Sequence, residues 1–191
     1  MYILFFWLLI TGYRLYLNKF NYKYIDLYMS TFHSIIVPIL YYYDRYDDII
    51  YFSYIYFLFD TFIIDDLKYK FHHILSLCAI LSVLYTNTNT MLMIGCNYLY
   101  YSEYPVILYN YIDYIERNYI NYPSYYKPLV TIHWLLMIYT RAYKIGEIGL
   151  YCILNLERNL SYYIMICVHV IIYGASMHWI INRGAYLKNK I

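Results

Sequence analysis

The sequence predicts an all-α membrane protein, a polytopic bundle of about seven transmembrane helices. Of its 191 residues, 63% are hydrophobic and only 14% are charged, whereas soluble domains average roughly 45–50% apolar and about 25% charged residues. The apolar residues also gather in seven stretches, each near the roughly 20 residues that cross a bilayer. A soluble fold of this length has too little interior to bury them.

The seven stretches follow one another without an internal repeat or a domain-sized linker, so we expect one compact helical domain. We expect the first stretch to be a retained helix, because it shows no cleavable signal pattern. The sixth contains Arg141, Lys144 and Gly146 and is either one tilted span or a helix broken near Gly146. The stretches cover residues 2–17, 28–43, 49–64, 71–86, 91–112, 128–154 and 161–182.

The basic residues between the stretches predict the orientation of the chain. When the loops are placed alternately on two sides, one side carries ten of the 14 Lys and Arg residues. The other side carries only Arg45 and Arg158, and the remaining two lie within the sixth stretch. Lys and Arg concentrate in cytoplasmic loops. We therefore expect a cytosolic C-terminus and an N-terminus outside the cell or in a lumen.

Composition also argues against several classes of partner. The net charge of +2 forms no basic stripe, so no nucleic-acid partner is expected. The four cysteines are scattered without CxxC or Cys/His spacing, so we predict neither a metal site nor a cofactor. Tyrosine is so abundant, at 33 residues, that a single tyrosine carries little weight as a functional signal.

Ionisable side chains inside the apolar stretches are the candidate functional residues, because placing them in lipid is costly. We expect most of them in the cytosolic half, around a cavity that opens to the cytosol, polar at its mouth and apolar below. Such a cavity suits an amphipathic lipid. The candidate lipid-binding residues are His33, Asp60, His72, His73, Glu103, Arg141 and His178.

Two purely structural interpretations compete with this hypothesis. Arg141 and Glu103 can form a direct ion pair that only joins two helices, and single histidines inside a bundle often serve as packing or hydrogen-bonding residues. His72 and His73 are about 100° apart on a helix. We therefore expect one of them to face the cavity and the other a neighbouring helix or the interface.

The order of these polar residues resembles the TLC-domain family, which includes the ceramide synthases. The resemblance covers about residues 27–190 and leaves residues 1–26 as a preceding helix with a basic cytosolic loop. No single segment is specific, but six occur in order along the chain. They are Ser30 to Ser34, Tyr54 to Asp60, Phe71 to Ser76, Ser102 to Asn110, Thr140 with Arg141, and His178 to Gly184.

The resemblance implies a role in lipid homeostasis at the endoplasmic reticulum, by binding, sensing or controlling membrane lipids. The expected partners are sphingolipids, phospholipids or fatty-acyl lipids. Ceramide synthases carry a pair of aspartates further along the chain from their histidine pair. This sequence has only Glu103 in that region, so it is closer to the small TLC-domain proteins that are not synthases.

An enzymatic alternative stays open beside lipid binding. It is a ceramide-synthase-like acyltransferase with acyl-CoA as co-substrate. In it, His72 or His73 is general base or transient acyl acceptor, and Asp60 or Glu103 orients it. A fatty-acid elongase is disfavoured because Tyr69 stands where its histidine box needs histidine. A structural or transport role is the third interpretation, and the sequence predicts no oligomeric state.

Overall fold

The structure, a computed structural model, describes Gly12 and residues 25–63, 67–86, 88–118 and 121–190. Within these residues the chain is helical almost throughout and contains no strand, which confirms the predicted all-α class. The first predicted stretch, residues 2–17, lies outside the described residues apart from Gly12. The elements are α2 (Ile25–Tyr42), α3 (Tyr46–Ile63), α4 (Leu67–Thr86), α5 (Asn89–Glu103), α6 (Val106–Asn118), α7 (Tyr126–Met137), η1 (Ile138–Lys144), α8 (Ile145–Asn155) and α9 (Leu160–Lys190).

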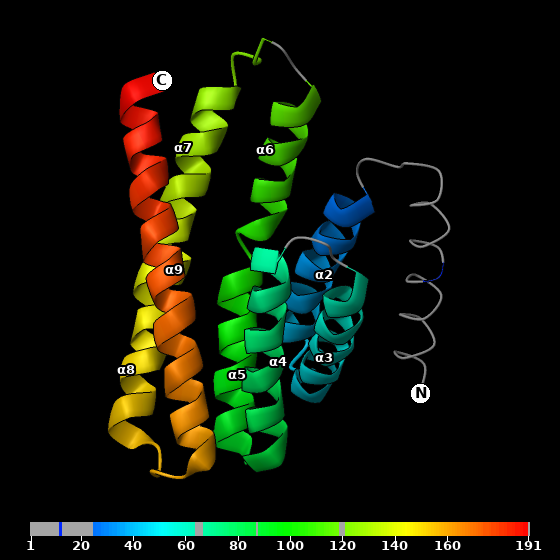
Figure 1. The fold of residues 1–191 in the computed structure, drawn as a ribbon, viewed down its shortest axis with the longest axis vertical. Helices are drawn as coiled ribbons and strands as arrows, with labels where there is room; N and C mark the ends of the chain where they lie inside the picture. The colour runs from blue at the N-terminus through cyan, green and yellow to red at the C-terminus, as the bar shows by residue number, and fades with distance from the viewer. Residues whose placement is uncertain (1–11, 13–24, 64–66, 87, 119–120, 191) are drawn as a thin grey trace.

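The helices run up and down the long axis of the molecule (Figure 1). The turns between α2 and α3, α4 and α5, and α8 and α9 point to one end. The α6–α7 connection and the C-terminal end of α9 lie at the other end. Helices α2 to α5 pack together, α9 packs against α4, α7 and α8, and α6 packs against α2 and α7.

The fifth predicted stretch, 91–112, is split into two helices by Pro105. Helix α5 ends at Glu103 and α6 begins at Val106. Proline lacks a backbone N–H, and its ring collides with the carbonyl one turn earlier, so it kinks or breaks an α-helix. Helix α2 tolerates Pro38 in its interior, whereas the chain breaks at Pro105. Pro105 is itself buried. The break therefore sits inside the bundle and lets α6 leave the direction of α5 (Figure 1).

The sixth predicted stretch, 128–154, stays helical throughout but changes its pitch. Residues Ile138–Lys144 form a π-helix between α7 and α8. The predicted alternatives were one tilted span or a break near Gly146, and the structure has a continuous helix whose π segment ends two residues before that glycine. A π turn holds one more residue than an α turn, and such segments occur frequently at functional sites.

The interior of the α2–α5 group is a close-packed apolar core. Val37, Ile49 and Ile50 are fully buried there. Gly95 allows α5 to approach α4, because a Cβ at this position would lie 2.9 Å from Cγ2 of Val83. Small residues permit such close approach between helices. This end of the bundle is therefore solid.

Large apolar side chains also cover the outer surface of the bundle. Phe62, Leu154 and Ile181 are 77%, 71% and 65% exposed, and many other large apolar residues are exposed as well. By length and apolar composition, one helix among the described residues, Leu160–Ala185 within α9, is able to cross a membrane. That single helix is compatible with insertion into a membrane.

Candidate functional site

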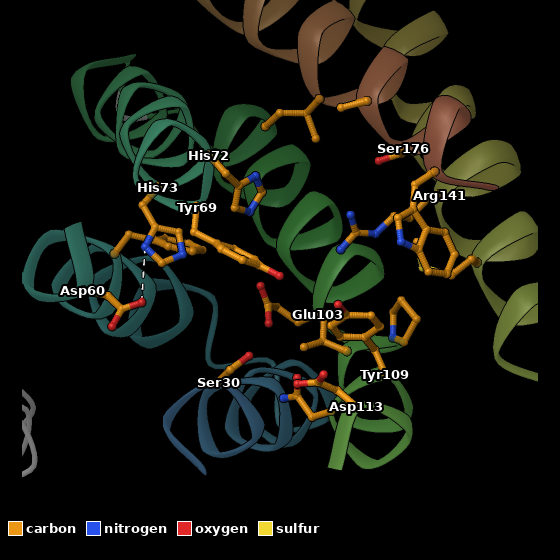
Figure 2. Close-up of a pocket in the computed structure, with 18 of the residues that line it drawn as sticks. Ser30, Asp60, Tyr69, His72, His73, Glu103, Tyr109, Asp113, Arg141 and Ser176 are labelled. Atoms are coloured by element: carbon orange, nitrogen blue, oxygen red, sulfur yellow. Dashed lines mark ion pairs between the residues drawn. The ribbon is translucent and has the colours of Figure 1, made fainter. Parts of the chain in front are cut away.

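The helices surround a space of about 810 Å³, which we call the central cavity. Side chains from α2 to α7, η1 and α9 line it, and Figure 2 shows the labelled polar residues gathered around one space. Pockets that bind small molecules typically measure roughly 300–1,000 Å³. The polar and aromatic lining residues used below are Ser30, Asp60, Tyr69, His72, His73, Glu103, Tyr109, Asn110, Asp113, Arg117, His133, Arg141, Ser176 and Trp179.

Asp60 and His73 form a buried carboxylate–imidazole pair in the cavity wall. Asp60 lies in the last turn of α3 and His73 in the second turn of α4. The Oδ2 atom of Asp60 is 3.3 Å from Nδ1 of His73. The ring centroids of Tyr56 and Phe57 lie 5.8 and 5.1 Å from that of His73. These aromatic rings hold the imidazole in the orientation that meets the carboxylate.

Glu103 is held in the wall by residues of α2. Nδ1 of His33 lies 3.2 Å from Oε2 of Glu103, and the Ser34 hydroxyl donates to the same oxygen at 2.7 Å. The His33 ring is stacked on Tyr56 at 4.1 Å between centroids, and its Nε2 lies 3.0 Å from the hydroxyl oxygen of Ser53. His33 is fully buried behind the wall. His33 therefore does not line the cavity itself. It contacts Glu103, which does.

Arg141, from the π segment, points into the cavity from the wall opposite Asp60 (Figure 2). Its Nη2 donates to the backbone carbonyl of Ser102 at 2.9 Å. Among the described residues, Arg141 and Glu103 form no direct ion pair, so the competing interpretation of a simple helix-joining pair is wrong for this structure. Opposite charges on the two sides of a water-poor cavity still attract each other, because the local dielectric is low.

Both histidines of the predicted pair line the cavity. His73 is buried against Asp60, and His72 lies beside it with ring centroids 5.7 Å apart. The Phe57 ring meets His72 edge-on at 6.3 Å. The expectation that one histidine would face the cavity and the other a neighbouring helix holds in part. Both line the cavity, and His73 also meets Asp60 of the neighbouring helix α3.

His178 is the one predicted site residue that lies away from the cavity and its wall. It is exposed, and its Nε2 lies 2.8 Å from the side-chain nitrogen of Asn182 on the same helix. The next residue, Trp179, lines the cavity instead. Adjacent residues point about 100° apart on a helix. The prediction of His178 is therefore correct for the turn of α9 that meets the cavity and wrong for the helix face, which carries Trp179.

Several lining residues are not among the candidate lipid-binding residues. Tyr69 and Tyr109 reach into the cavity from α4 and α6 (Figure 2). Asp113 and Arg117 on α6 form an ion pair at 2.6 Å near the end of that helix. His133 from α7 packs edge-on against Trp179 with centroids 5.2 Å apart. The i, i+4 spacing of Asp113 and Arg117 in the sequence indicates an ion pair on one helix face. No sequence feature distinguishes Tyr69 and Tyr109 from the other tyrosines.

The apolar part of the cavity lies at its side. The predicted apolar chamber beneath the polar residues is closed, with a residual pocket of only about 40 Å³ between α3, α4, α5 and α9. Apolar residues from several helices line the cavity, among them Leu75 on α4 and Ile171, Ile172 and Ala175 on α9. We call these four residues the α4–α9 seam. An apolar chain that enters the cavity meets this seam.

The site offers acid–base and anion-binding groups but no metal centre among the described residues, where no three His, Cys, Asp or Glu side chains come together as a metal ion would need. Comparisons of the chain with protein-family models, with curated proteins and with solved structures find no match.

Proposed function

We propose that this chain is a multi-pass membrane protein of the TLC type that binds a lipid in the central cavity and acts in lipid homeostasis. One observation carries the proposal. A cavity with buried charged residues and an apolar seam sits inside a helical bundle whose outer surface is rich in large apolar side chains. An amphipathic lipid has the matching combination of a polar group and an apolar chain.

The distribution of side chains supports a membrane location. Thirteen polar or charged residues are buried inside the bundle, among them Asp60, Glu103 and His133, while large apolar side chains face outward. Soluble proteins rarely expose large contiguous apolar patches, which mark contact with a membrane or a partner. Buried polar groups that pair with one another are typical of helices that cross lipid.

The seven-span topology and the cytosolic C-terminus are part of this proposal. The up-and-down course of the described helices is consistent with loops that alternate between two sides (Figure 1). The test combines two measurements. The protein should stay with membranes in alkaline carbonate, and a reporter fused after Ile191 should be accessible from the cytosol. A lumenal reporter would contradict the orientation and the cytosolic opening of the cavity.

All six segments that resemble the TLC-domain family supply residues that line the cavity. The first contributes Ser30 and the last Trp179, and the four between them contribute Asp60, the His72–His73 pair, Glu103 with Asn110, and Arg141. The resemblance therefore concentrates on one site, as expected if the shared residues handle the same kind of ligand. It supports the inference that the ligand is a membrane lipid and that the protein works at the endoplasmic reticulum.

The decisive experiment is a comparison of total cellular lipids. Cells that express the wild-type protein, a His72→Ala/His73→Ala variant or the control His178→Ala are compared with cells that lack the protein. Lipid homeostasis predicts a shift in composition with the wild type and with His178→Ala, because His178 lies outside the cavity. Unchanged lipid composition in all cells would contradict the proposed function.

The Asp60–His73 pair favours acyl transfer as a second candidate. A carboxylate that orients an imidazole through one nitrogen prepares the other to accept a proton. In this reaction an amine or hydroxyl of a lipid attacks the thioester carbonyl of acyl-CoA. The new C–N or C–O bond forms, the C–S bond breaks, and the proton passes through His73 to the departing thiolate.

Thiol release from acyl-CoA tests this second candidate. The purified protein should release free CoA only when an acceptor lipid is present. His73→Ala should abolish the release, whereas Asp60→Asn should lower it while the acyl acceptor still binds. A lipid shift in cells that persists with the His72→Ala/His73→Ala variant would exclude catalysis by the pair and leave lipid binding as the function.

A further inference from the structure

The acidic residues of the central cavity already have partners within the protein. Asp60 is paired with His73, Glu103 with His33 and Ser34, and Asp113 with Arg117. A buried charge without compensation is unfavourable, and a paired one is much less so. The carboxylates therefore do not require a cationic ligand to balance them.

Arg141 is compensated far less completely. Its Nη2 donates to the carbonyl of Ser102, while its Nε is buried and makes no hydrogen bond with the residues that the structure describes. A guanidinium carries five N–H donors in a planar fork and stays charged. Burying such a group with donors unused is costly. The guanidinium of Arg141 would be stabilised by a hydrogen-bond acceptor, and an anionic group is the strongest acceptor.

His133 also lines the cavity and carries a second buried polar atom that is unused. It is 1% exposed, and its Nδ1 has no hydrogen-bond partner among the described residues. The rings of Trp179 and Tyr109 pack against it with centroids 5.2 and 5.8 Å away. A neutral histidine can donate from either ring nitrogen. His133 is therefore able to donate one hydrogen bond to a ligand without carrying a charge.

The π segment brings these two residues onto neighbouring faces. His133 and Arg141 are eight residues apart, which on an α-helix leaves them about 80° out of line after two turns. The helix between them passes into the π segment Ile138–Lys144, whose wider turn rotates the chain less per residue. The residual angle is thereby reduced, and both residues line the central cavity.

We propose that Arg141 and His133 form a subsite of the central cavity that binds the anionic group, a carboxylate or a phosphate, of a lipid ligand. This inference rests on the proposed function, because it names the chemical class of the lipid. Arg141 donates two parallel hydrogen bonds to the anion, and His133 donates one. Oε2 of Glu103 is already engaged on the α2 side, where it lies 3.2 Å from Nδ1 of His33 and accepts from the Ser34 hydroxyl.

The apolar chain of the ligand lies along the α4–α9 seam. Ile172 lines the central cavity and also the small pocket beside Arg141. Ile171 and Phe71 line the cavity at the edge of the seam and are 45% and 53% exposed. The seam therefore leads from the arginine to the apolar exterior of the bundle, which gives a membrane lipid a route of entry from the side.

The test uses the full chain in phosphatidylcholine nanodiscs and four probes with the same hydrocarbon chain length. Oleate carries a carboxylate, oleoyl lysophosphatidate a phosphate, oleyl alcohol no charge, and oleylamine a positive charge. The wild type should bind at least one anionic probe about tenfold or more tightly than the alcohol, as expected for charge-assisted hydrogen bonds. Whichever anion binds more tightly identifies the headgroup as carboxylate or phosphate.

Variants assign the preference to the subsite. Arg141→Gln should lose most of the tenfold preference, and Arg141→Lys should keep part of it. His133→Leu should weaken anion binding several-fold without leaving a buried charge unpaired, so it serves if Arg141→Gln does not fold. His178→Ala on the outside of α9 is the control and should bind like the wild type.

Two results overturn the inference while the proposed function stands. They are equal binding of oleate, lysophosphatidate and oleyl alcohol by the wild type, and an anion preference that survives in both Arg141→Gln and His133→Leu. Tighter binding of oleylamine than of either anion also overturns the inference. It would indicate that the acidic side chains of the cavity bind a cationic headgroup. Absence of binding for every probe contradicts the proposed function itself.

Discussion

Nδ1 of His73 lies 3.3 Å from Oδ2 of Asp60, and both side chains are more than nine-tenths buried. This contact joins α3 to α4 at the wall of the central cavity. The contact can orient the imidazole of His73 for proton transfer, and it also stabilises the packing of α3 against α4. The two roles make different predictions, since stability depends on the pair whether or not the protein is an enzyme.

Asp60→Ala should lower the free energy of unfolding by about 3–5 kcal/mol, because it leaves a buried imidazole without its partner. The measurement is denaturant unfolding in a lipid-like detergent. The matched control is Asp48→Ala, whose partner Arg45 is 65% exposed. An exposed pair contributes about 1 kcal/mol or less. Equal losses in the two variants would contradict the structural role of the buried pair.

Gly149→Ala tests the contact between α8 and α9. A Cβ at Gly149 would lie 2.1 Å from Nε2 of His169, whose ring is stacked on Tyr173 with centroids 5.4 Å apart. Overpacking of this kind costs about 1–3 kcal/mol. At Gly174 no atom lies within 4 Å of the added methyl, so Gly174→Ala should be neutral or stabilising by up to about 1 kcal/mol. Matching unfolding temperatures for the two variants would show that His169 moves aside freely.

The residues most readable from the sequence were ionisable groups in apolar surroundings. Asp60, His72, His73, Glu103 and Arg141 stood out because such groups are costly in lipid, and all five line the cavity. The all-helical fold was likewise predictable from the long apolar stretches. A charged residue within an apolar stretch is a strong signal of a functional site, since helix packing alone does not require a charge there.

Other features depended on three-dimensional packing. His178 was named because it lies in the right turn of α9, but a helix that is apolar on most sides does not reveal which face meets a cavity. Tyr69 and Tyr109 could not be singled out as cavity residues, because the sequence contains 33 tyrosines. The π segment has no reliable sequence mark. Pro105, by contrast, was a readable signal for the break between α5 and α6 that the predicted 91–112 stretch ignored.

Glu116→Ala should loosen the end of the bundle where α6, α7 and α9 meet. The Oε1 atom of Glu116 accepts hydrogen bonds from Nη2 of Arg183 at 2.9 Å and from the hydroxyl of Tyr126. Losing them from a partly buried site should cost about 1–3 kcal/mol in unfolding free energy. Glu147→Ala removes the 55%-exposed partner of Lys144 and should cost about 0.5 kcal/mol or less. A loss at position 147 as large as that at position 116 would contradict the three-helix contact.

Ala175→Trp should obstruct the route of the lipid chain without removing any charged group. Ala175 belongs to the α4–α9 seam and is also exposed on the outer face of α9, so an indole has space to fold over the seam. Oleate binding should weaken by about tenfold or more, which corresponds to about 1.4 kcal/mol. Ala185→Trp places the same side chain on an exposed position of α9 that does not line the cavity and should leave binding unchanged. If Ala175→Trp binds oleate normally while Arg141→Gln does not, the anionic group occupies the cavity and its chain leaves by another path, between α4 and α6 past Tyr69. Comparing the two tryptophan variants therefore locates the chain independently of the headgroup.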